Sequence, residues 1–220
     1  MRKIFIVGGA GKIGRILAAE LVQRDLQPFS LCRKAEQADA LQALGATPVI
    51  GDLLDLNIAQ MASKMDGCDA VIFTAGAGGK GGEEMTNAID GDGLALSVAA
   101  ARRAGIKRFV LVSAFPEAGR GKKDASPTFE NYMKVKKQAE VHLASSDLDW
   151  VIVRPGTLTD HPASGLIDAG LTLPYSTVSR GDVASTLAEV VNMPQISRTI
   201  IELTQGGTVV KEALQHLIAE

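Results

Sequence analysis

The stretch KIFIVGGAGKIG, residues 3–14, decides the fold of this chain. A short apolar run leads into three glycines with the spacing G-x-x-G-x-x-G. Apolar residues then recur at the spacing of one helix face: Ile13, Ile16, Leu17 and Leu21. Glycines let a backbone approach a pyrophosphate closely, and the free N–H groups of a helix start attract its charge. The stretch therefore predicts a dinucleotide site, with a purely structural tight turn as the alternative.

Length and composition are those of an ordinary globular domain. The chain has 220 residues, of which 46% are hydrophobic and 22% charged, and these numbers predict one domain over residues 1–220. A net charge of −2 gives no indication of a nucleic-acid partner. The apolar runs are strand-sized and the chain begins in a strand, so we expect neither a membrane span nor a signal peptide. Two cysteines and three scattered histidines suggest reduced thiols, no metal site and a cytoplasmic location.

Strand-like and helix-like segments alternate along the whole chain. Strands are expected at residues 3–7, 28–32, 47–50, 70–74, 108–113, 150–154 and 199–203. Helices are expected at residues 12–24, 35–44, 57–65, 86–104, 128–145, 180–192 and 208–218. This alternation predicts an α/β fold, a Rossmann-type doubly wound parallel sheet with helices on both faces.

Long loops follow three of the expected strands, at residues 75–85, 114–127 and 155–179. Ligands of such sheets bind beyond the carboxyl ends of the strands, where these loops lie. Long loops at one edge of a compact domain are more often functional than idle. We therefore expect a small substrate-side region formed by residues 114–127 and 155–180.

The residues that end the second strand indicate which dinucleotide binds. Sites for NAD place an Asp or Glu here to hold the ribose 2′-hydroxyl, whereas this chain has Arg33 and Lys34. A carboxylate would repel a 2′-phosphate, but a guanidinium binds it through charge-assisted hydrogen bonds. The pair favours NADP(H) over NAD(H), and a solvated basic strand end is the alternative.

Small and polar residues after the third and fourth strands complete the expected cofactor site. Asp52, next to Leu53, is placed to accept a hydrogen bond from the adenine amino group, or else to cap a turn. Ala75 and Gly76 end the fourth strand, where small residues let the cofactor ribose lie against the backbone.

Ser113, Tyr132 and Lys136 are the candidates for catalysis. Ser113 ends the fifth strand, and Tyr132 and Lys136 lie four residues apart on one face of the next helix. A free tyrosine has a pKa of about 10, and a nearby ammonium lowers it toward the range useful for acid–base work. The serine hydroxyl would bind a substrate oxygen. The alternative is a half-buried aromatic and a solvated lysine on a surface helix.

These motifs, together with Val153-Arg154-Pro155-Gly156, resemble the short-chain dehydrogenase/reductase superfamily over almost the whole chain. The chain is most similar to the atypical single-domain branch, which is related to extended epimerase/dehydratase enzymes and to NmrA-like and biliverdin reductase B-like proteins. The resemblance makes Ser113, Tyr132 and Lys136 the catalytic group. The residues that it places at the cofactor are Gly8, Gly11, Lys12, Ile13, Gly14, Arg33, Lys34, Asp52, Leu53, Ala75, Gly76, Lys136, Pro155 and Gly156.

Two departures from the family pattern bear on function. Asp90 stands where the active enzymes usually have Asn, and the segment after Pro155 is too short for the substrate domain of sugar-nucleotide epimerases. The resemblance thus implies an NADPH-dependent oxidoreductase acting on a small carbonyl, quinone or flavin-like acceptor. A non-catalytic NADP(H)-binding redox sensor of NmrA-like type is the alternative. We expect a monomer, or a homodimer that pairs through the helix at 86–104.

Overall fold

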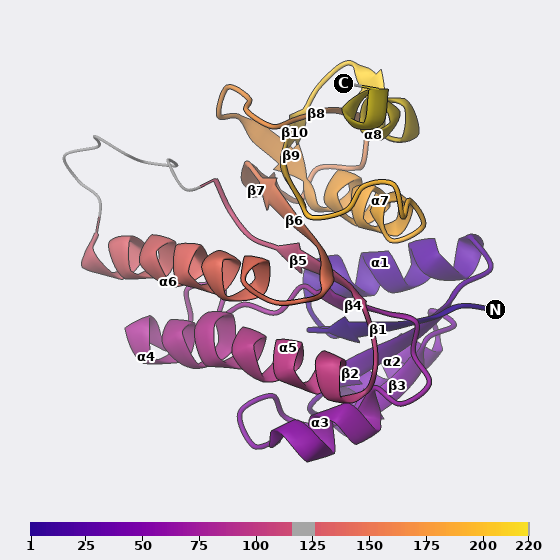
Figure 1. The fold of residues 1–220 in the computed structure, drawn as a ribbon, viewed down its shortest axis with the longest axis vertical. Coiled ribbons are helices and arrows are strands. Elements are labelled where there is room, and N and C mark those ends of the chain that lie inside the picture. The colour runs from indigo at the N-terminus through magenta and orange to yellow at the C-terminus, as the bar shows by residue number, and fades with distance from the viewer. Residues whose placement is uncertain (116–125, 220) are drawn as a thin grey trace.

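The computed structural model describes residues 1–115 and 126–219 (Figure 1). Within them a nine-stranded sheet has the order β11-β8-β10-β6-β5-β4-β1-β2-β3, and a separate ribbon pairs β7 with β9. The strands are β1 (Lys3–Val7), β2 (Gln27–Cys32), β3 (Thr47–Ile50), β4 (Ala70–Phe73), β5 (Arg108–Val112), β6 (Asp149–Pro155), β7 (Thr157–Thr159), β8 (Leu166–Gly170), β9 (Thr177–Ser179), β10 (Thr199–Gln205) and β11 (Thr208–Val209).

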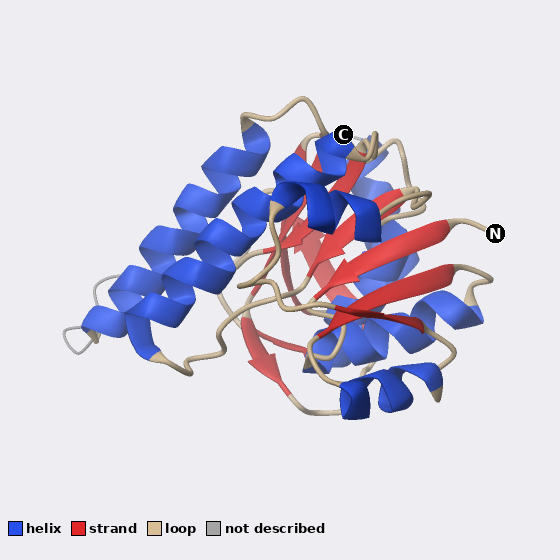
Figure 2. Ribbon diagram, turned by 90° about the horizontal axis from the view of Figure 1, so that it is seen from below, coloured by secondary structure: helices blue, strands red, loops and turns tan. Residues whose placement is uncertain are grey.

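Helices cover both faces of this sheet (Figure 2). Helices α1, α7 and α8 pack on one face, and α3, α5 and α6 on the other. The helical segments are α1 (Lys12–Gln23), α2 (Ala35–Gln42), α3 (Ile58–Lys64), α4 (Gly82–Thr86), the π-turn η1 (Asn87–Asp92), α5 (Gly93–Arg103), α6 (Pro127–Ala144), α7 (Arg180–Val190) and α8 (Val210–Ala219). None of the helices in the described residues is long and apolar enough to cross a membrane.

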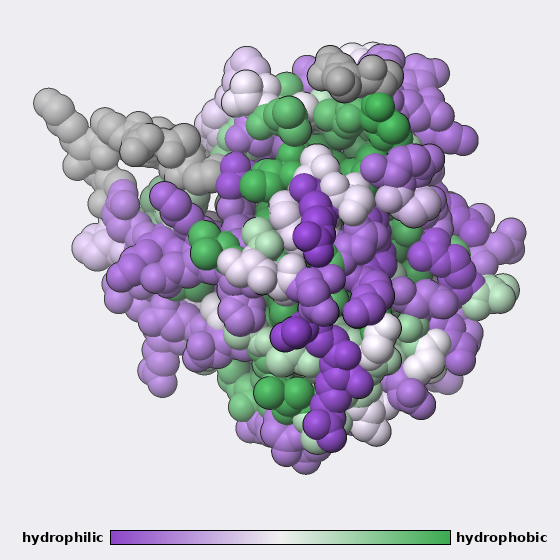
Figure 3. Space-filling model, in the orientation of Figure 1, coloured by the Kyte–Doolittle hydropathy of each residue, from purple (hydrophilic) through white to green (hydrophobic). Residues whose placement is uncertain are grey.

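Two apolar clusters, one on each face, explain why the central strands are apolar throughout. Along β1, Ile4 and Ile6 point into the cluster under α1 and α7, and Phe5 and Val7 point into the cluster under α3 and α5. Successive side chains of a strand alternate between faces, so a strand covered on both sides has no polar face. The space-filling view shows polar side chains over much of one face of the molecule, with apolar ones gathered mainly toward its upper end (Figure 3).

The predicted doubly wound sheet is confirmed, with corrections at one edge and in one helix. Strand β8 runs antiparallel to β10, and β11 runs antiparallel to β8, so the sheet is not parallel throughout. Three short strands, β7 to β9, occupy the segment 155–179 that we predicted as a loop. The single helix predicted at 86–104 is divided by η1. Most of the predicted loop at 114–127 lies outside the described residues.

Candidate cofactor site

The turn between β1 and α1 has the backbone geometry that its glycines predict. Gly8 has a φ of +83°, a left-handed conformation that glycine adopts without strain, and a Cβ there would lie 2.6 Å from the Ala75 nitrogen. The Gly11 N–H donates to the Gly8 carbonyl at 2.9 Å, which closes the turn. Thr74 Oγ1 donates to the Val7 carbonyl at 3.0 Å and joins β4 to the turn.

The start of α1 is open to an anion. Gly11 is the N-cap of this helix and offers no side-chain hydrogen bond to its first turn. The backbone N–H groups of Lys12, Ile13 and Gly14 therefore face the loop without a cap, and such groups bind phosphate. The side chain of Ile13 lies in the core, so its contribution to this site is its backbone alone.

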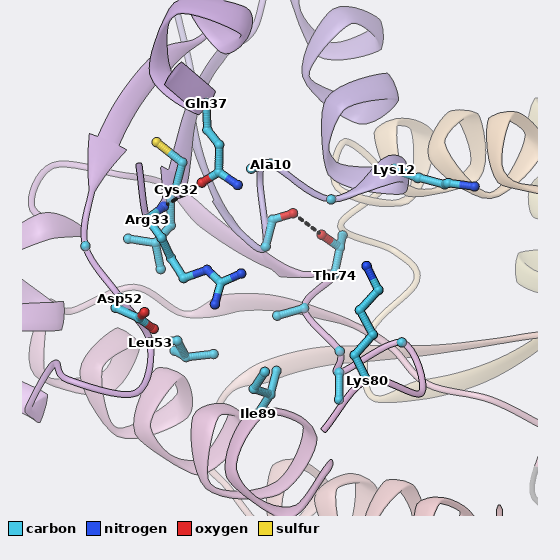
Figure 4. Close-up of a pocket in the computed structure, with 18 residues that line it drawn as sticks. Ala10, Lys12, Cys32, Arg33, Gln37, Asp52, Leu53, Thr74, Lys80 and Ile89 are labelled. Atoms are coloured by element: carbon cyan, nitrogen blue, oxygen red, sulfur yellow. Dashed lines mark hydrogen bonds between the residues drawn. The ribbon is translucent and has the colours of Figure 1, made fainter. Parts of the chain in front are cut away.

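A cavity of 460 Å³ opens at the carboxyl ends of β1 to β4. It brings together eight of the residues predicted for the cofactor, namely Gly8, Gly11, Lys12, Arg33, Asp52, Leu53, Ala75 and Gly76 (Figure 4). Lys34, Ile13, Gly14, Lys136, Pro155 and Gly156 are not among the lining residues. A glycine turn, an uncapped helix start and a basic side chain in one cavity fit the phosphates of a dinucleotide.

The basic end of the cavity is shaped by Gln37, which the sequence analysis missed. Its Oε1 accepts hydrogen bonds from the backbone N–H groups of Arg33 at 2.9 Å and Lys34 at 3.1 Å. This fixes the backbone at the end of β2, and the guanidinium of Arg33 extends into the cavity (Figure 4). The spacing Lys34-x-x-Gln37, in which the third helical residue reaches back to the N-cap, was the available signal.

Asp52 lines the cavity and also has the turn role that we weighed as its alternative. Its Oδ1 accepts a hydrogen bond from the Leu54 N–H at 3.0 Å. The other lining residues that were not predicted come mainly from the glycine-rich segment after β4 and from β2, namely Ala10, Leu31, Cys32, Gly51, Thr74, Ala77, Gly78, Lys80 and Ile89. Composition alone did not show which of these would face inward.

Ser113 and the ammonium of Lys136 both lie at the carboxyl end of β5, outside the lining of the cavity. The ammonium of Lys136 donates to the carbonyl of Val112, the residue before Ser113, at 2.8 Å. Ser113 is 4% exposed, and its Oγ has no hydrogen-bond partner among the described residues. An unpartnered buried hydroxyl is uncommon and costly, which suits a group that awaits a ligand.

Pro155 and Gly156 lie beside this point on the neighbouring strand. The Ser113 N–H donates to the Val153 carbonyl at 2.7 Å, and β6 ends two residues later at Pro155. The Gly156 N–H donates to the Leu203 carbonyl at 2.9 Å. A side chain on Gly156 would run into the carbonyl oxygen of Ser176, so this position has room only for glycine.

The electrostatics around Tyr132 differ from those that we predicted. Burial, the carboxylate of Asp90 and the hydroxyl of Tyr175 together raise the pKa of Tyr132 to about 12. We expected Lys136 to lower this pKa. Its ammonium instead lies 3.5 Å from an oxygen of Asp90, and Lys136 is not among the groups that shift the Tyr132 pKa.

The fold and this cavity define a dinucleotide-binding protein of the short-chain dehydrogenase/reductase type. Residues 8–194 match the family model described as NAD(P)H-binding, and the chain belongs to that family. It is thus a member of an NAD(P)-binding, epimerase- and oxidoreductase-like group of proteins.

Three bacterial relatives match almost the whole chain. The uncharacterized sugar epimerase YhfK of Bacillus subtilis is 36% identical over 98% of this chain and 100% of its own. A candidate NAD-dependent epimerase/dehydratase from Bacillus halodurans superimposes with a TM-score of 0.89 at 29% identity, covering 99% of this chain and 100% of its own. The oxidoreductase ylbE from Lactococcus lactis superimposes with a TM-score of 0.85 at 32% identity, covering 99% and 97%.

Proposed function

We propose that this protein is an NADPH-dependent reductase of a small carbonyl, quinone or flavin-like acceptor. The proposal rests on one observation: the cofactor cavity and the candidate catalytic residues lie at the same edge of the sheet. The cavity reaches Ala75, Gly76 and Ala77 after β4, and Ser113 with Lys136 lies at the end of β5, the next strand. A dinucleotide held by the glycine turn and extended past Ala75 would bring its nicotinamide toward this second group.

Each residue then has a task that its surroundings support. Arg33 binds the 2′-phosphate, and the open first turn of α1 binds the pyrophosphate. Bound NADPH supplies the hydride. Ser113 orients the substrate oxygen through its hydroxyl, which has no partner in the described part of the chain, and Tyr132 donates a proton to that oxygen. Between β6 and α7 there are only short strands and loops, which leaves room for a compact substrate rather than a sugar nucleotide.

The preference for NADPH rests on Arg33 and predicts a specific loss. In Arg33→Ala, NADPH affinity should fall about 10- to 100-fold, because a charge-assisted hydrogen bond contributes about 1.5–3 kcal/mol. Affinity for NADH should change less than about threefold, since NADH has no 2′-phosphate. Fluorescence titration of both cofactors measures this. Lys34→Ala is the matched control, because it removes the same charge outside the cavity lining. An equal loss for both cofactors would exclude the 2′-phosphate role.

If Tyr132 is the general acid, its removal should lower turnover and leave NADPH binding unchanged. In Tyr132→Phe, kcat should fall about 10²- to 10⁴-fold, the usual contribution of a general acid, while NADPH affinity stays within about twofold. Steady-state NADPH oxidation over a panel of ketones, aldehydes and quinones measures kcat. Tyr175→Phe changes the other tyrosine of the chain, which acts on Tyr132 only through its pKa, and should therefore lower kcat far less than Tyr132→Phe. The proposal fails if the parent protein oxidises NADPH with no member of the panel.

One observation favours a second candidate, a redox sensor that binds NADP(H) without turnover. A tyrosine with a pKa of about 12 is poorly suited to removing protons at neutral pH. A sensor would bind NADPH and NADP⁺ with different affinities and show no turnover on the panel. A reductase would show turnover that depends on Tyr132.

A further inference from the structure

Asp90 is a buried carboxylate to which the proposed reductase mechanism gives no role. It lies in η1 and is 2% exposed. Its Oδ2 accepts a hydrogen bond from the Ala77 N–H at 2.9 Å, and its Oδ1 lies 3.5 Å from the Lys136 ammonium. Ala77 lines the cofactor cavity. One side chain therefore contacts both the cofactor-facing segment and the helix that carries Tyr132.

The ammonium of Lys136 is held by two acceptors from different elements. It donates to the Val112 carbonyl on β5 at 2.8 Å and forms the ion pair with Asp90 on η1. A lysine ammonium has three donor protons, so one remains for a ligand at the end of β5. The side chain is buried, and a charge in such a place is stable only when it is paired.

Of the charged groups around Lys136, Asp90 is the one that serves as its counter-ion. On α6, Glu140 lies one turn after Lys136, but its carboxylate accepts two hydrogen bonds from Arg154, at 2.9 and 2.6 Å. Tyr132 lies one turn before. Burial lowers the pKa of Lys136, and Asp90, with a smaller contribution from Glu140, opposes this. Without the Asp90 charge, burial would favour the neutral amine.

We propose that Asp90 is a positioning residue, which keeps Lys136 charged and directs its third proton toward the ribose of bound NADPH. The inference rests on the proposed function in assigning Lys136 to that ribose. Asp90 also acts on the protonation of Tyr132, because a carboxylate near Tyr132 disfavours the phenolate. Tyr132 then gives its proton to the substrate oxygen as the carbonyl carbon takes the hydride, the carbonyl π-electrons move to that oxygen, and water returns a proton to Tyr132. Asp90 thus helps to keep Tyr132 in the protonated form that reduction uses.

The test measures NADPH affinity by fluorescence from about pH 6 to about pH 9.5, a range over which an ordinary lysine stays mostly charged. In the parent protein the affinity should be nearly constant. In Asp90→Asn, whose amide can still accept from Ala77, it should match the parent at the acid end. It should then fall about tenfold as Lys136 loses its proton, because a hydrogen bond to a charged donor is lost. Asp92→Asn removes an exposed carboxylate from the same turn and should follow the parent.

A pH profile of Asp90→Asn that parallels the parent would overturn the proposal. If Asp90→Asn does not fold, the double variant Asp90→Asn/Lys136→Met is compared with Lys136→Met. The double variant removes both charges, a change that buried pairs often tolerate. Equal NADPH affinities would support the proposal, because Asp90 then acts through Lys136. A weaker double variant would mean that Asp90 acts separately through Ala77. Binding is measured without substrate, so failure of the reductase function would appear as missing turnover beside an unchanged binding result.

Discussion

Replacing Gly14 with alanine should abolish NADPH binding, with at least a 100-fold loss of affinity. Helix propensity favours the substitution by about 0.5–1 kcal/mol. The surroundings oppose it more strongly, because a Cβ on Gly14 would lie 2.9 Å from the Gly9 Cα and collide with the carbonyl oxygen of Gly8. These are backbone atoms of the turn, and overpacking a rigid site costs about 1–3 kcal/mol. The turn must move away from α1, and the pyrophosphate then loses its N–H donors.

Fluorescence titration with NADPH and thermal unfolding together test this prediction. Gly207→Ala is the matched control, because a Cβ there meets nothing within 4 Å and the φ of Gly207 is not positive. The control should bind like the parent. If Gly14→Ala binds NADPH within about threefold of the parent, then the close approach of turn and helix is not required for binding.

The turn between β1 and α1 could be predicted from the sequence because its contacts are local. A strand, a turn and a helix start follow each other within residues 3–14, so every contact among Gly8, Gly11 and Gly14 is local. Arg33 was predictable for a related reason, since parallel strands end at one sheet edge and β2 lies beside β1. Local patterns and strand order together placed eight of the residues that line the cavity, and missed the others.

Contacts between segments far apart in sequence were not predictable. The antiparallel strand β8 is short and partly exposed, so it lacks the continuous apolar run that marks the central strands. Asp90 was noticed as an unusual residue, but its bond to Ala77 depends on η1, and a π-turn has no clear sequence signal. Burial of Tyr132, and after it the charge of Asp90, then reversed the expected direction of the Tyr132 pKa shift. The direction of this pKa shift therefore follows from the packed structure and could not be predicted from the sequence.

Replacing Arg108 with alanine should lower the free energy of unfolding by about 3–5 kcal/mol, the usual cost of removing one partner of a buried ion pair. Arg108 begins β5 and is 6% exposed. Its guanidinium donates to both oxygens of Asp149, at 3.1 and 3.0 Å. It also donates to three carbonyls at and beyond the end of α7, those of Val190, Met193 and Ile196, at 2.6, 3.2 and 2.7 Å. Alanine would leave the three buried carbonyls without their donor, and it would leave the partly exposed carboxylate of Asp149 without its partner.

Urea unfolding followed by circular dichroism measures this loss, and Arg102→Ala is its control. Arg102 pairs with Asp147 at 2.7 Å, but both side chains are 56% exposed, and exposed pairs contribute about 1 kcal/mol or less. Arg108→Lys should recover only part of the loss, because an ammonium cannot donate along the five directions of a guanidinium. Arg108 lies at the amino end of β5, opposite the edge that forms the cofactor site. Folded Arg108→Ala should therefore bind NADPH like the parent, and a loss of affinity comparable to that of Gly14→Ala would show that the two edges of the sheet are coupled.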